Sequence, residues 1–340
     1  MRILLYAECG PAVGTGHVMR CIALAHSLHS RGDDILIASE DGSANELAGR
    51  EGLPFHAVSR GHIDSMLAAD AFDVAVIDSY LMSSETLATL NRLVPVVYFD
   101  DLQQDVFGVS LLVNGNLTAK LERYDRIYRG RSTRVLAGAS YCVLRQEFSN
   151  LPRFENKRQI ENVLISTGGS DPHAASVHLS ETLLACRPLS DATVHVLVGA
   201  LNPNVDKLQD LEKASGRLVL HRGVSRVAGI MRMCDLAVAA AGTTLNELCT
   251  CGVPTIAYAL ADNQRGCPAV FARKSAACDA GEYLDDRFFC RFSALIERAA
   301  SDYHFRVSLS RASQQLFDGK GSNRICEAIH ELIHTNREEG

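Results

Sequence analysis

Short apolar runs alternate with longer segments of helical periodicity along the whole chain. The first runs are rich in Val, Ile and Leu, end in Gly, Asp or Ser, and lie at residues 3–7, 34–38, 74–77 and 96–99, with a helical pattern over residues 18–28. The same alternation restarts with runs at residues 163–166, 193–198, 218–220, 236–239 and 255–258. Continuous apolar runs are typical of parallel strands that helices cover on both faces. The pattern predicts an α/β protein with two doubly wound parallel sheets.

A polar stretch that contains proline separates the two series of runs. It lies at residues 150–157, and this composition is typical of a linker. We therefore predict an N-terminal domain over residues 1–150 and a C-terminal domain over residues 151–340. The chain beyond residue 286 turns helical, with candidate helices at 288–300, 305–317 and 322–334.

Composition narrows the class of protein. The 340 residues include 34 basic and 40 acidic side chains, and no basic run offers a nucleic acid the positive stripe that it needs. The eleven cysteines never form a Cys-x-x-Cys pair, which favours a reducing compartment. With neither a signal peptide pattern nor an apolar run of about 20 residues, we expect a cytoplasmic protein without stable membrane association, in which the glycosylation sequon at Asn116 has no role.

The segment after the first strand offers a candidate base. Gly14 and Gly16 let the backbone approach a ligand closely, and His17 and Arg20 follow in the first turns of the next helix. Gly14, Gly16 and Arg20 are expected to contact the substrate. The positive end of a helix dipole disfavours the imidazolium form, so His17 is expected to be neutral and able to accept a proton from water or a hydroxyl. The alternative is a histidine that is merely hydrogen-bonded near a turn.

The second series of strands opens with a similar turn. Gly168, Gly169, Ser170 and Asp171 follow the strand at 163–166 directly, and Pro172 suits the first turn of a helix. Backbone amides in such a turn form a pocket for a diphosphate. The alternative is an ordinary capped turn between a strand and a helix.

A third strand-to-helix junction carries hydroxyl groups and a carboxylate. Gly242, Thr243 and Thr244 offer amides and hydroxyls at a helix start, and Glu247 lies one turn further, where it could accept two hydrogen bonds from a ribose diol. The alternative is a capping box between Thr244 and Glu247.

Two further polar clusters follow strands. Each could point into a cleft between the domains, but either cluster alone is also typical of a plain loop. They are Asp78-Ser79-Tyr80 and Asp262-Asn263-Gln264.

One motif matches a zinc site but has a simpler explanation. His330-Glu331-Leu332-Ile333-His334 fits the zinc-protease pattern, whereas Ile325, Ile329 and Ile333 form an apolar stripe that accounts for the helix without metal. We therefore expect no metal site and no cofactor.

Together these motifs resemble one family, the UDP-sugar hydrolases of pseudaminic acid biosynthesis. The resemblance rests on the Gly14-x-Gly16-His17-x-x-Arg20 start, the Gly168 turn, the Gly242 segment with Glu247, and the Asp262 cluster, and it covers nearly the whole chain. It implies two Rossmann-like domains that face each other across a cleft, a glycosyltransferase-B (GT-B)-like fold. The family commonly has Gly-Ser where this chain has Thr243-Thr244, which keeps a hydroxyl group.

The resemblance also implies a reaction and roles. The expected reaction is metal-independent, inverting hydrolysis of UDP-2,4-diacetamido-2,4,6-trideoxy-β-L-altropyranose to UDP and the free sugar. In this family His17 corresponds to the base, Tyr80 and Asn263 to assisting residues, and Gly168 to Asp171 with Thr243, Thr244 and Glu247 to the UDP site. Two alternatives stay open, a glycosyltransferase of the same fold that moves the sugar to an acceptor, and a non-catalytic module that binds a nucleotide sugar without turnover.

Overall fold

The computed structural model describes residues 1–10, 15–199 and 201–338, and the chain divides into two compact units. Unit 1 comprises Met1–Ser149 together with the chain from Gly319 onward, and unit 2 comprises Asn150–Asp318. The break at 149/150 lies at the predicted linker. The last helix differs from the sequence-based assignment, because it belongs to unit 1 rather than to the second domain.

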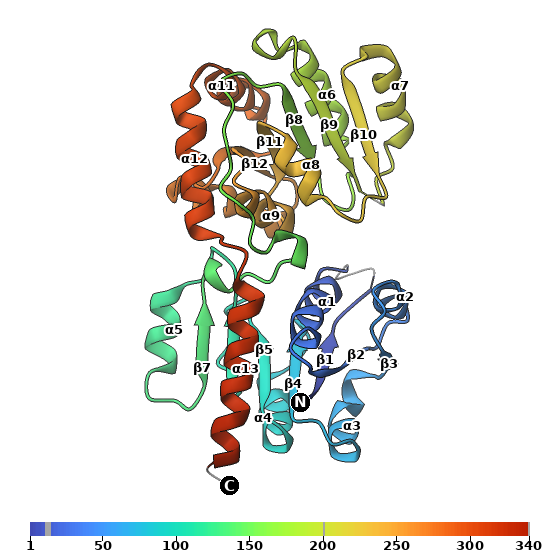
Figure 1. Ribbon diagram of the computed structural model, residues 1–340, viewed down its shortest axis with the longest axis vertical. Coiled ribbons are helices and arrows are strands. Elements are labelled where there is room, and N and C mark those ends of the chain that lie inside the picture. Colours follow the sequence, from blue (N-terminus) through green and yellow to red (C-terminus); the bar gives the residue numbers. More distant parts are fainter. Residues whose placement is uncertain (11–14, 200, 339–340) are drawn as a thin grey trace. The chain divides into compact units, whose positions relative to one another are not determined.

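Unit 1 is built on a seven-stranded parallel sheet with the order β3-β2-β1-β4-β5-β6-β7 (Figure 1). Its strands are β1 (Arg2–Ala7), β2 (Asp34–Ser39), β3 (Phe55–Ala57), β4 (Val74–Asp78), β5 (Val96–Phe99), β6 (Leu111–Asn114) and β7 (Arg134–Ala137). The chain runs from β1 outward to β3 and then returns to the other side of β1 with β4. The strand order therefore reverses between β1 and β4, the position where open α/β sheets bind ligands.

Helices cover both faces of this sheet. The helices of unit 1 are α1 (Gly16–His29), α2 (Ser43–Arg50), α3 (Ile63–Ala69), α4 (Ser84–Leu93), α5 (Leu121–Tyr128) and α13 (Gly321–Glu338). Apolar residues of α1, α2 and α13 share one buried cluster with side chains of β1, β2 and β4. Those of α3, α4 and α5 share a second cluster with the alternate residues of the same strands. This alternation explains why the strands read as continuous apolar runs.

The apolar stripe of α13 packs into the core of unit 1. Ile325, Ile329 and Ile333 are all buried in the cluster that contains α1. The polar residues of the zinc-like motif bind protein groups: His330 Nε2 lies 2.7 Å from Asp33 Oδ2, and Glu331 lies 2.6 Å from Arg134. The buried stripe and these two polar contacts together hold the last helix in unit 1.

Unit 2 repeats the doubly wound arrangement on a six-stranded parallel sheet with the order β10-β9-β8-β11-β12-β13. Its strands are β8 (Asn162–Ser166), β9 (Thr193–Val198), β10 (Leu218–Arg222), β11 (Leu236–Ala240), β12 (Thr255–Ala259) and β13 (Cys278–Glu282). Here the order reverses between β8 and β11. The two sheets therefore each have one topological switch point.

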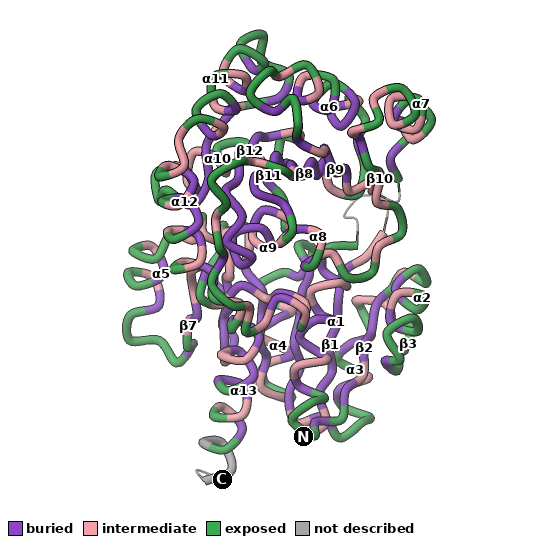
Figure 2. Tube along the Cα trace, turned by 45° about the horizontal axis from the view of Figure 1, so that its top comes forward, coloured by how far each residue is buried: buried purple, intermediate pink, exposed green. Residues whose placement is uncertain are grey.

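The helices of unit 2 pack on this sheet and on one another. They are α6 (Ala175–Ala185), α7 (Val205–Ser215), α8 (Ala228–Met233), α9 (Thr243–Cys251), α10 (Cys267–Arg273), α11 (Phe288–Ser301) and α12 (Tyr303–Leu316). The central strands are almost wholly buried, whereas α2 and α7 are mixed or largely exposed (Figure 2). None of the helices in the described ranges is long and apolar enough to cross a membrane.

Candidate functional site

The carboxyl ends of β1 and β4 bring a histidine and an aspartate into contact in unit 1. His17 is the second residue of α1, which follows β1, and Asp78 is the last residue of β4. The imidazole Nδ1 lies 2.5 Å from Asp78 Oδ1, and both side chains are buried. A carboxylate at Nδ1 fixes the tautomer that carries its proton there and leaves Nε2 as the acceptor.

The second ring nitrogen is available for chemistry. Within the described part of the chain, no hydrogen bond is made to His17 Nε2. Asp78, which the sequence analysis named only within a polar cluster, also has a negative charge that stabilises the imidazolium formed when the ring takes a proton. His17 is thus arranged as a proton acceptor with an orienting partner.

Arg20 lies one turn along α1 and binds the same carboxylate, with its Nη2 3.4 Å from His17 Nδ1. Its Nε donates to Asp78 Oδ2 at 2.7 Å and its Nη2 to Asp78 Oδ1 at 2.6 Å. The same guanidinium donates to both oxygens of Asp101 at 3.0 and 2.8 Å, and it covers the ring of Phe99. Arg20 therefore joins the ends of β4 and β5.

Asp101 receives bonds from two further residues. Asn116 Nδ2 donates to its Oδ1 at 2.7 Å, and the Tyr80 hydroxyl donates to its Oδ2 at 3.3 Å. The Tyr80 ring stands edge-on to His17, with ring centroids 4.4 Å apart. The structure thus brings His17, Arg20 and Tyr80 together, as the sequence pattern favoured, and adds Asp101 and Asn116.

Burial and charge shift the pKa values of this network in directions that agree with its bonding. Burial alone raises the pKa of Asp101, but the Arg20 guanidinium outweighs it and holds that pKa below 3.8. Burial disfavours the charge on Arg20, yet Asp101 and Asp78 raise its pKa well above the usual value of an arginine. Burial, followed by the charge of Asp101, raises the pKa of Tyr80, so its phenol stays protonated at neutral pH.

A buried glutamate fixes the turn that carries Tyr80. Glu8 follows β1, and its Oε2 accepts hydrogen bonds from the Ser79 hydroxyl at 3.0 Å and the Tyr80 amide at 2.8 Å. The Glu8 amide in turn donates to the Asp78 carbonyl at 2.9 Å. The backbone on either side of the switch point is therefore tied together directly beside His17.

In unit 2 the glycine turn after β8 is held by its neighbours. Asp171 is fully buried, and its carboxylate accepts bonds from the amides of Ala175 and Ser176 at 2.8 Å each. The helix begins at Ala175, so the expected placement of Pro172 in its first turn is wrong; Pro172 precedes a left-handed Ala174. The Asp171 carboxylate thus binds the first two amides of α6, as in a capped turn between a strand and a helix.

The turn itself leaves no room for a side chain on the neighbouring strand end. A Cβ at Gly199, which follows β9, would overlap the carbonyl oxygens of Gly168 and Gly169. Gly168 has a φ of +85°, a conformation that favours glycine. In contrast, a Cβ at Gly168 or Gly169 would meet no described atom within 4 Å. The turn is therefore in close contact with Gly199 but has open space beside its own glycines, and Ser170 at its end is exposed.

Two more predicted segments lie at the same edge of this sheet. Helix α9 begins at Thr243 with Gly242 as its N-cap residue, and no side chain caps it, so the alternative of a capping box at Thr244 is wrong. The polar cluster after β12 forms a short 3-10 turn, Asp262–Gln264. Gln264 Nε2 would lie 3.8 Å from a Cβ at Gly242, so this turn adjoins the start of α9.

Other predicted residues are placed less informatively. Asp262 and Asn263 are exposed, and Asp262 pairs with Arg265 at 3.0 Å. Glu247 lies in the second turn of α9 and is partly buried. Gly14 lies outside the described residues, and Gly16 opens α1 with free space beside it. The ligand contacts expected of all these residues stay predictions.

The sequence reasoning missed one buried hydroxyl group at the switch point of unit 2. Thr167 directly follows β8, and its Oγ1 is buried without a hydrogen-bond partner in the described structure. Buried polar atoms are nearly always paired, so a lone one beside a glycine turn is a feature to explain. Its position directly before Gly168 was the only signal in the sequence.

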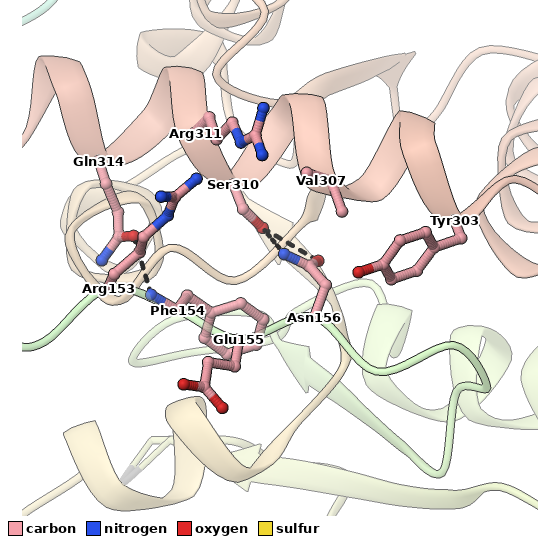
Figure 3. A pocket seen from close by; sticks show the side chains of 9 residues that line it. All are labelled: Arg153, Phe154, Glu155, Asn156, Tyr303, Val307, Ser310, Arg311 and Gln314. Carbon is pink, nitrogen blue, oxygen red and sulfur yellow. Dashed lines mark hydrogen bonds between the residues drawn. The ribbon is translucent and has the colours of Figure 1, made fainter.

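A separate pocket of about 210 Å³ lies in unit 2 between residues 153–156 and α12 (Figure 3). The Phe154 amide donates to Gln314 Oε1, and Asn156 exchanges hydrogen bonds with Ser310. None of its lining residues is a predicted site residue. They are Arg153, Phe154, Glu155, Asn156, Tyr303, Val307, Ser310, Arg311 and Gln314. Its polar groups mainly fasten the linker to α12.

Comparison with known proteins gives distant relatives. No protein-family model matches the chain. The spore coat polysaccharide biosynthesis protein SpsG of Bacillus subtilis (strain 168) is 23% identical over 347 residues, which cover 98% of this chain and 98% of that protein. An uncharacterized protein of Methanocaldococcus jannaschii is 22% identical over 350 residues, covering 99% of this chain and 68% of that protein.

Solved glycosyltransferases share the fold over nearly the whole chain. MurG of Acinetobacter baumannii superposes with a TM-score of 0.67 at 14% identity, covering 97% of this chain and 99% of that one. The glycosyltransferase of kitacinnamycin gives 0.68 at 15% identity, covering 97% and 98%. A Streptomyces sp. SF2575 glycosyltransferase complexed with thymidine diphosphate gives 0.58 at 16% identity, covering 96% and 99%. The predicted fold class, two Rossmann-like α/β units of the GT-B kind, is confirmed.

Proposed function

We propose that this protein is an enzyme that hydrolyses a UDP-sugar at the anomeric C–O bond. The observation that carries the proposal is the contact between His17 and Asp78 at the switch point of unit 1, which leaves His17 Nε2 as an acceptor. A non-catalytic module that only binds a nucleotide sugar has no need of an oriented base. The relative named for polysaccharide biosynthesis and the fold shared with glycosyltransferases support a substrate of the nucleotide-sugar class.

The proposed step moves one proton and breaks one bond. His17 Nε2 takes a proton from water while the water oxygen attacks the anomeric carbon. The bond from that carbon to the phosphate oxygen breaks, and its electron pair leaves with UDP. Attack from the side opposite the leaving group inverts the anomeric centre. Asp78 stabilises the imidazolium that forms, and the Tyr80 hydroxyl stays protonated beside the ring.

Unit 2 has the groups that suit the departing diphosphate. A Cβ at Gly168 or Gly169 would meet no described atom within 4 Å, and the N-cap residue of α9, Gly242, has no side chain to occupy the first amides of that helix. Amides at a helix start stabilise negative charge, and such donors matter most where charge develops during the reaction. We therefore assign UDP to this edge, with the buried Thr167 hydroxyl as a further candidate contact.

Hydrolysis in ¹⁸O-water tests the position of cleavage. With UDP-2,4-diacetamido-2,4,6-trideoxy-β-L-altropyranose as the first probe, chosen from the family resemblance, we expect label in the free sugar and none in UDP. Label in the β-phosphate of UDP would instead mean cleavage of the P–O bond to the sugar, and labelled UMP or sugar phosphate would mean cleavage of the phosphoanhydride; either result would contradict the proposal. UDP-N-acetylglucosamine, tested in parallel, measures how strongly the enzyme selects the sugar.

A His17→Asn variant tests the base. We expect kcat to fall by about 10²–10⁴, the usual contribution of general-base catalysis, while UDP binding to the protein stays unchanged. Calorimetric titration with UDP supplies the second measurement. Turnover at the wild-type rate in this variant would remove His17 from the mechanism.

Transfer of the sugar to an acceptor is a second candidate function. Exposed apolar side chains favour it, because Leu81 after β4 is 60% exposed and Leu102 after β5 is 46% exposed, and both follow strands that carry the His17 network. The solved structures that share the fold are also glycosyltransferases. The two functions differ in one measurement, since a transferase releases UDP only when an acceptor is added, whereas a hydrolase releases it with water alone.

A further inference from the structure

The guanidinium of Arg20 is engaged at all three nitrogens by carboxylates of the same unit. Nε and Nη2 bind the two oxygens of Asp78, and Nη1 and Nη2 bind the two oxygens of Asp101. The side chain is only 20% exposed, and its face rests on the Phe99 ring. Because protein carboxylates occupy all three nitrogens, this geometry argues against the substrate contact that the motif suggested for Arg20.

The charges of the network depend on the state of His17. Asp78 and Asp101 each carry a negative charge and Arg20 a positive one, so the network has a net charge of −1 beside a neutral imidazole and becomes neutral when the ring takes a proton. Without Arg20, the ring would lie near two negative charges and no positive one. Without the charge of Asp101, the charges of Arg20 and Asp78 would cancel each other. A nearby negative charge favours the protonated ring and a positive charge disfavours it.

We propose that Arg20 is a positioning residue that sets the basicity of His17 through Asp78, with Asp101 and Asn116 holding the guanidinium in place. The inference rests on the proposed role of His17 as the base. It predicts that removal of Arg20 and removal of the Asp101 charge change the pH dependence of the reaction in opposite directions. A merely structural role of the same residues predicts loss of activity with no such opposition.

The other charged groups on elements that pack on α1 are engaged elsewhere. Glu8 beyond β1 binds Ser79 and Tyr80, and Asp41 before α2 binds Ser43. Further ion pairs on these elements are Glu147 with Arg145, and His330 on α13 with Asp33. Asp100 at the end of β5 accepts from the Tyr124 hydroxyl, and Cys21 on α1 is a buried thiol. All of these stay in place in the variants below, so they contribute equally to each profile.

The first experiment measures kcat/KM against pH in wild type and four variants. Relative to wild type, Arg20→Met should move the acidic limb of the profile to higher pH by about one unit, because neutral His17 is then scarcer at a given pH. Asp101→Asn should move it to lower pH. Arg20→Lys keeps the charge but cannot bind both carboxylates, so its limb should stay near that of wild type while kcat falls. The exposed Arg50, replaced by Met, is the matched control.

The second experiment does not depend on turnover. The Cε1–H signal of the His17 imidazole, assigned by its absence in His17→Asn, is titrated by NMR in the same proteins, and its midpoint should move as the limbs do. Equal midpoints in Arg20→Met, Asp101→Asn and wild type would overturn the proposal. If Arg20→Met fails to fold, an unmoved midpoint in Asp101→Asn has the same consequence. Opposite shifts without any UDP-sugar cleavage would instead refute the proposed function and leave the role of Arg20 standing.

Discussion

Replacing Asp78 by asparagine exchanges one carboxylate oxygen at the centre of the network for an amide nitrogen and leaves the shape of the side chain almost unchanged. The carboxylate is fully buried and accepts three hydrogen bonds, one from His17 and two from Arg20. An asparagine has a single acceptor oxygen, and its amide group is a donor. If the oxygen stays with Arg20 Nε, the amide meets His17 Nδ1, which must then accept. The ring proton is driven to Nε2, and the base is lost.

The opposite orientation of the amide is also unfavourable. The amide would then face Arg20 Nε, and two donors would meet in a buried site. Either orientation also removes the negative charge that stabilises the imidazolium. Loss of the correct tautomer in the serine protease triad costs about 10⁴ in kcat, so we expect a loss of about 10³–10⁴ here. At about 1.4 kcal/mol for each factor of ten, this is roughly 4–5.5 kcal/mol of transition-state stabilisation.

The assay is UDP release from the saturating probe sugar nucleotide, with kcat and KM determined separately. Breaking a buried ion pair also destabilises the fold, so thermal unfolding must show that the variant is folded at the assay temperature. Asp33→Asn is the matched control, because Asp33 is another buried carboxylate of unit 1, bound to the N-terminal amine and His330. A kcat for Asp78→Asn within threefold of wild type would refute the assigned role of Asp78.

Three further predictions concern binding and stability. Gly199→Val should weaken UDP binding by about tenfold or more in calorimetry, because the new side chain displaces the Gly168 turn, while the titration of His17 stays unchanged. Gly321→Ala should destabilise unit 1 by about 1–3 kcal/mol in urea unfolding, because its Cβ would overlap the Cys142 backbone at the start of α13. Ionised Asp101 stabilises the fold at neutral pH, and this contribution is lost as pH falls through its lowered pKa. The stability deficit of Asp101→Asn should therefore shrink below pH 3.8.

The alternation of apolar runs and helical segments was sufficient to predict both sheets and the strands around their switch points, but it did not include β3, β6, β7 or β13. The central strands are buried on both faces, so the run itself carries the signal. β3 has only three residues, of which two are exposed, and β13 has the sequence CDAGE with a glycine and two carboxylates. Strands at the edge of a sheet need less apolar surface. Their pairing is therefore decided by tertiary context, which the local pattern does not contain.

The sequence indicated those candidate residues that have a local motif at the end of their own strand. It did not indicate residues from separate strands that meet only in the folded sheet. His17 and Tyr80 follow β1 and β4, and their glycine and turn signals are local. Asp101 and Asn116 follow β5 and β6, and nothing near either residue indicates that one guanidinium and one amide meet there. Asn116 matched only a glycosylation sequon. The strand order, once known, makes the convergence unsurprising, because successive parallel strands place their carboxyl ends along one edge.

The two units use the same topological position for groups of opposite character. The edge of unit 1 carries Asp78, Asp101 and Glu8 against the single cation Arg20, so it is negative in sum and unsuited to a diphosphate. At the edge of unit 2, the one buried carboxylate, Asp171, is turned to the amides of α6, and the outer side offers glycine backbone. An imidazole exchanges a proton near neutral pH, and carboxylates beside it favour its protonated form, whereas backbone amides stabilise an anion without titrating. Charge alone therefore favours the base in unit 1 and the nucleotide in unit 2, independently of the family resemblance.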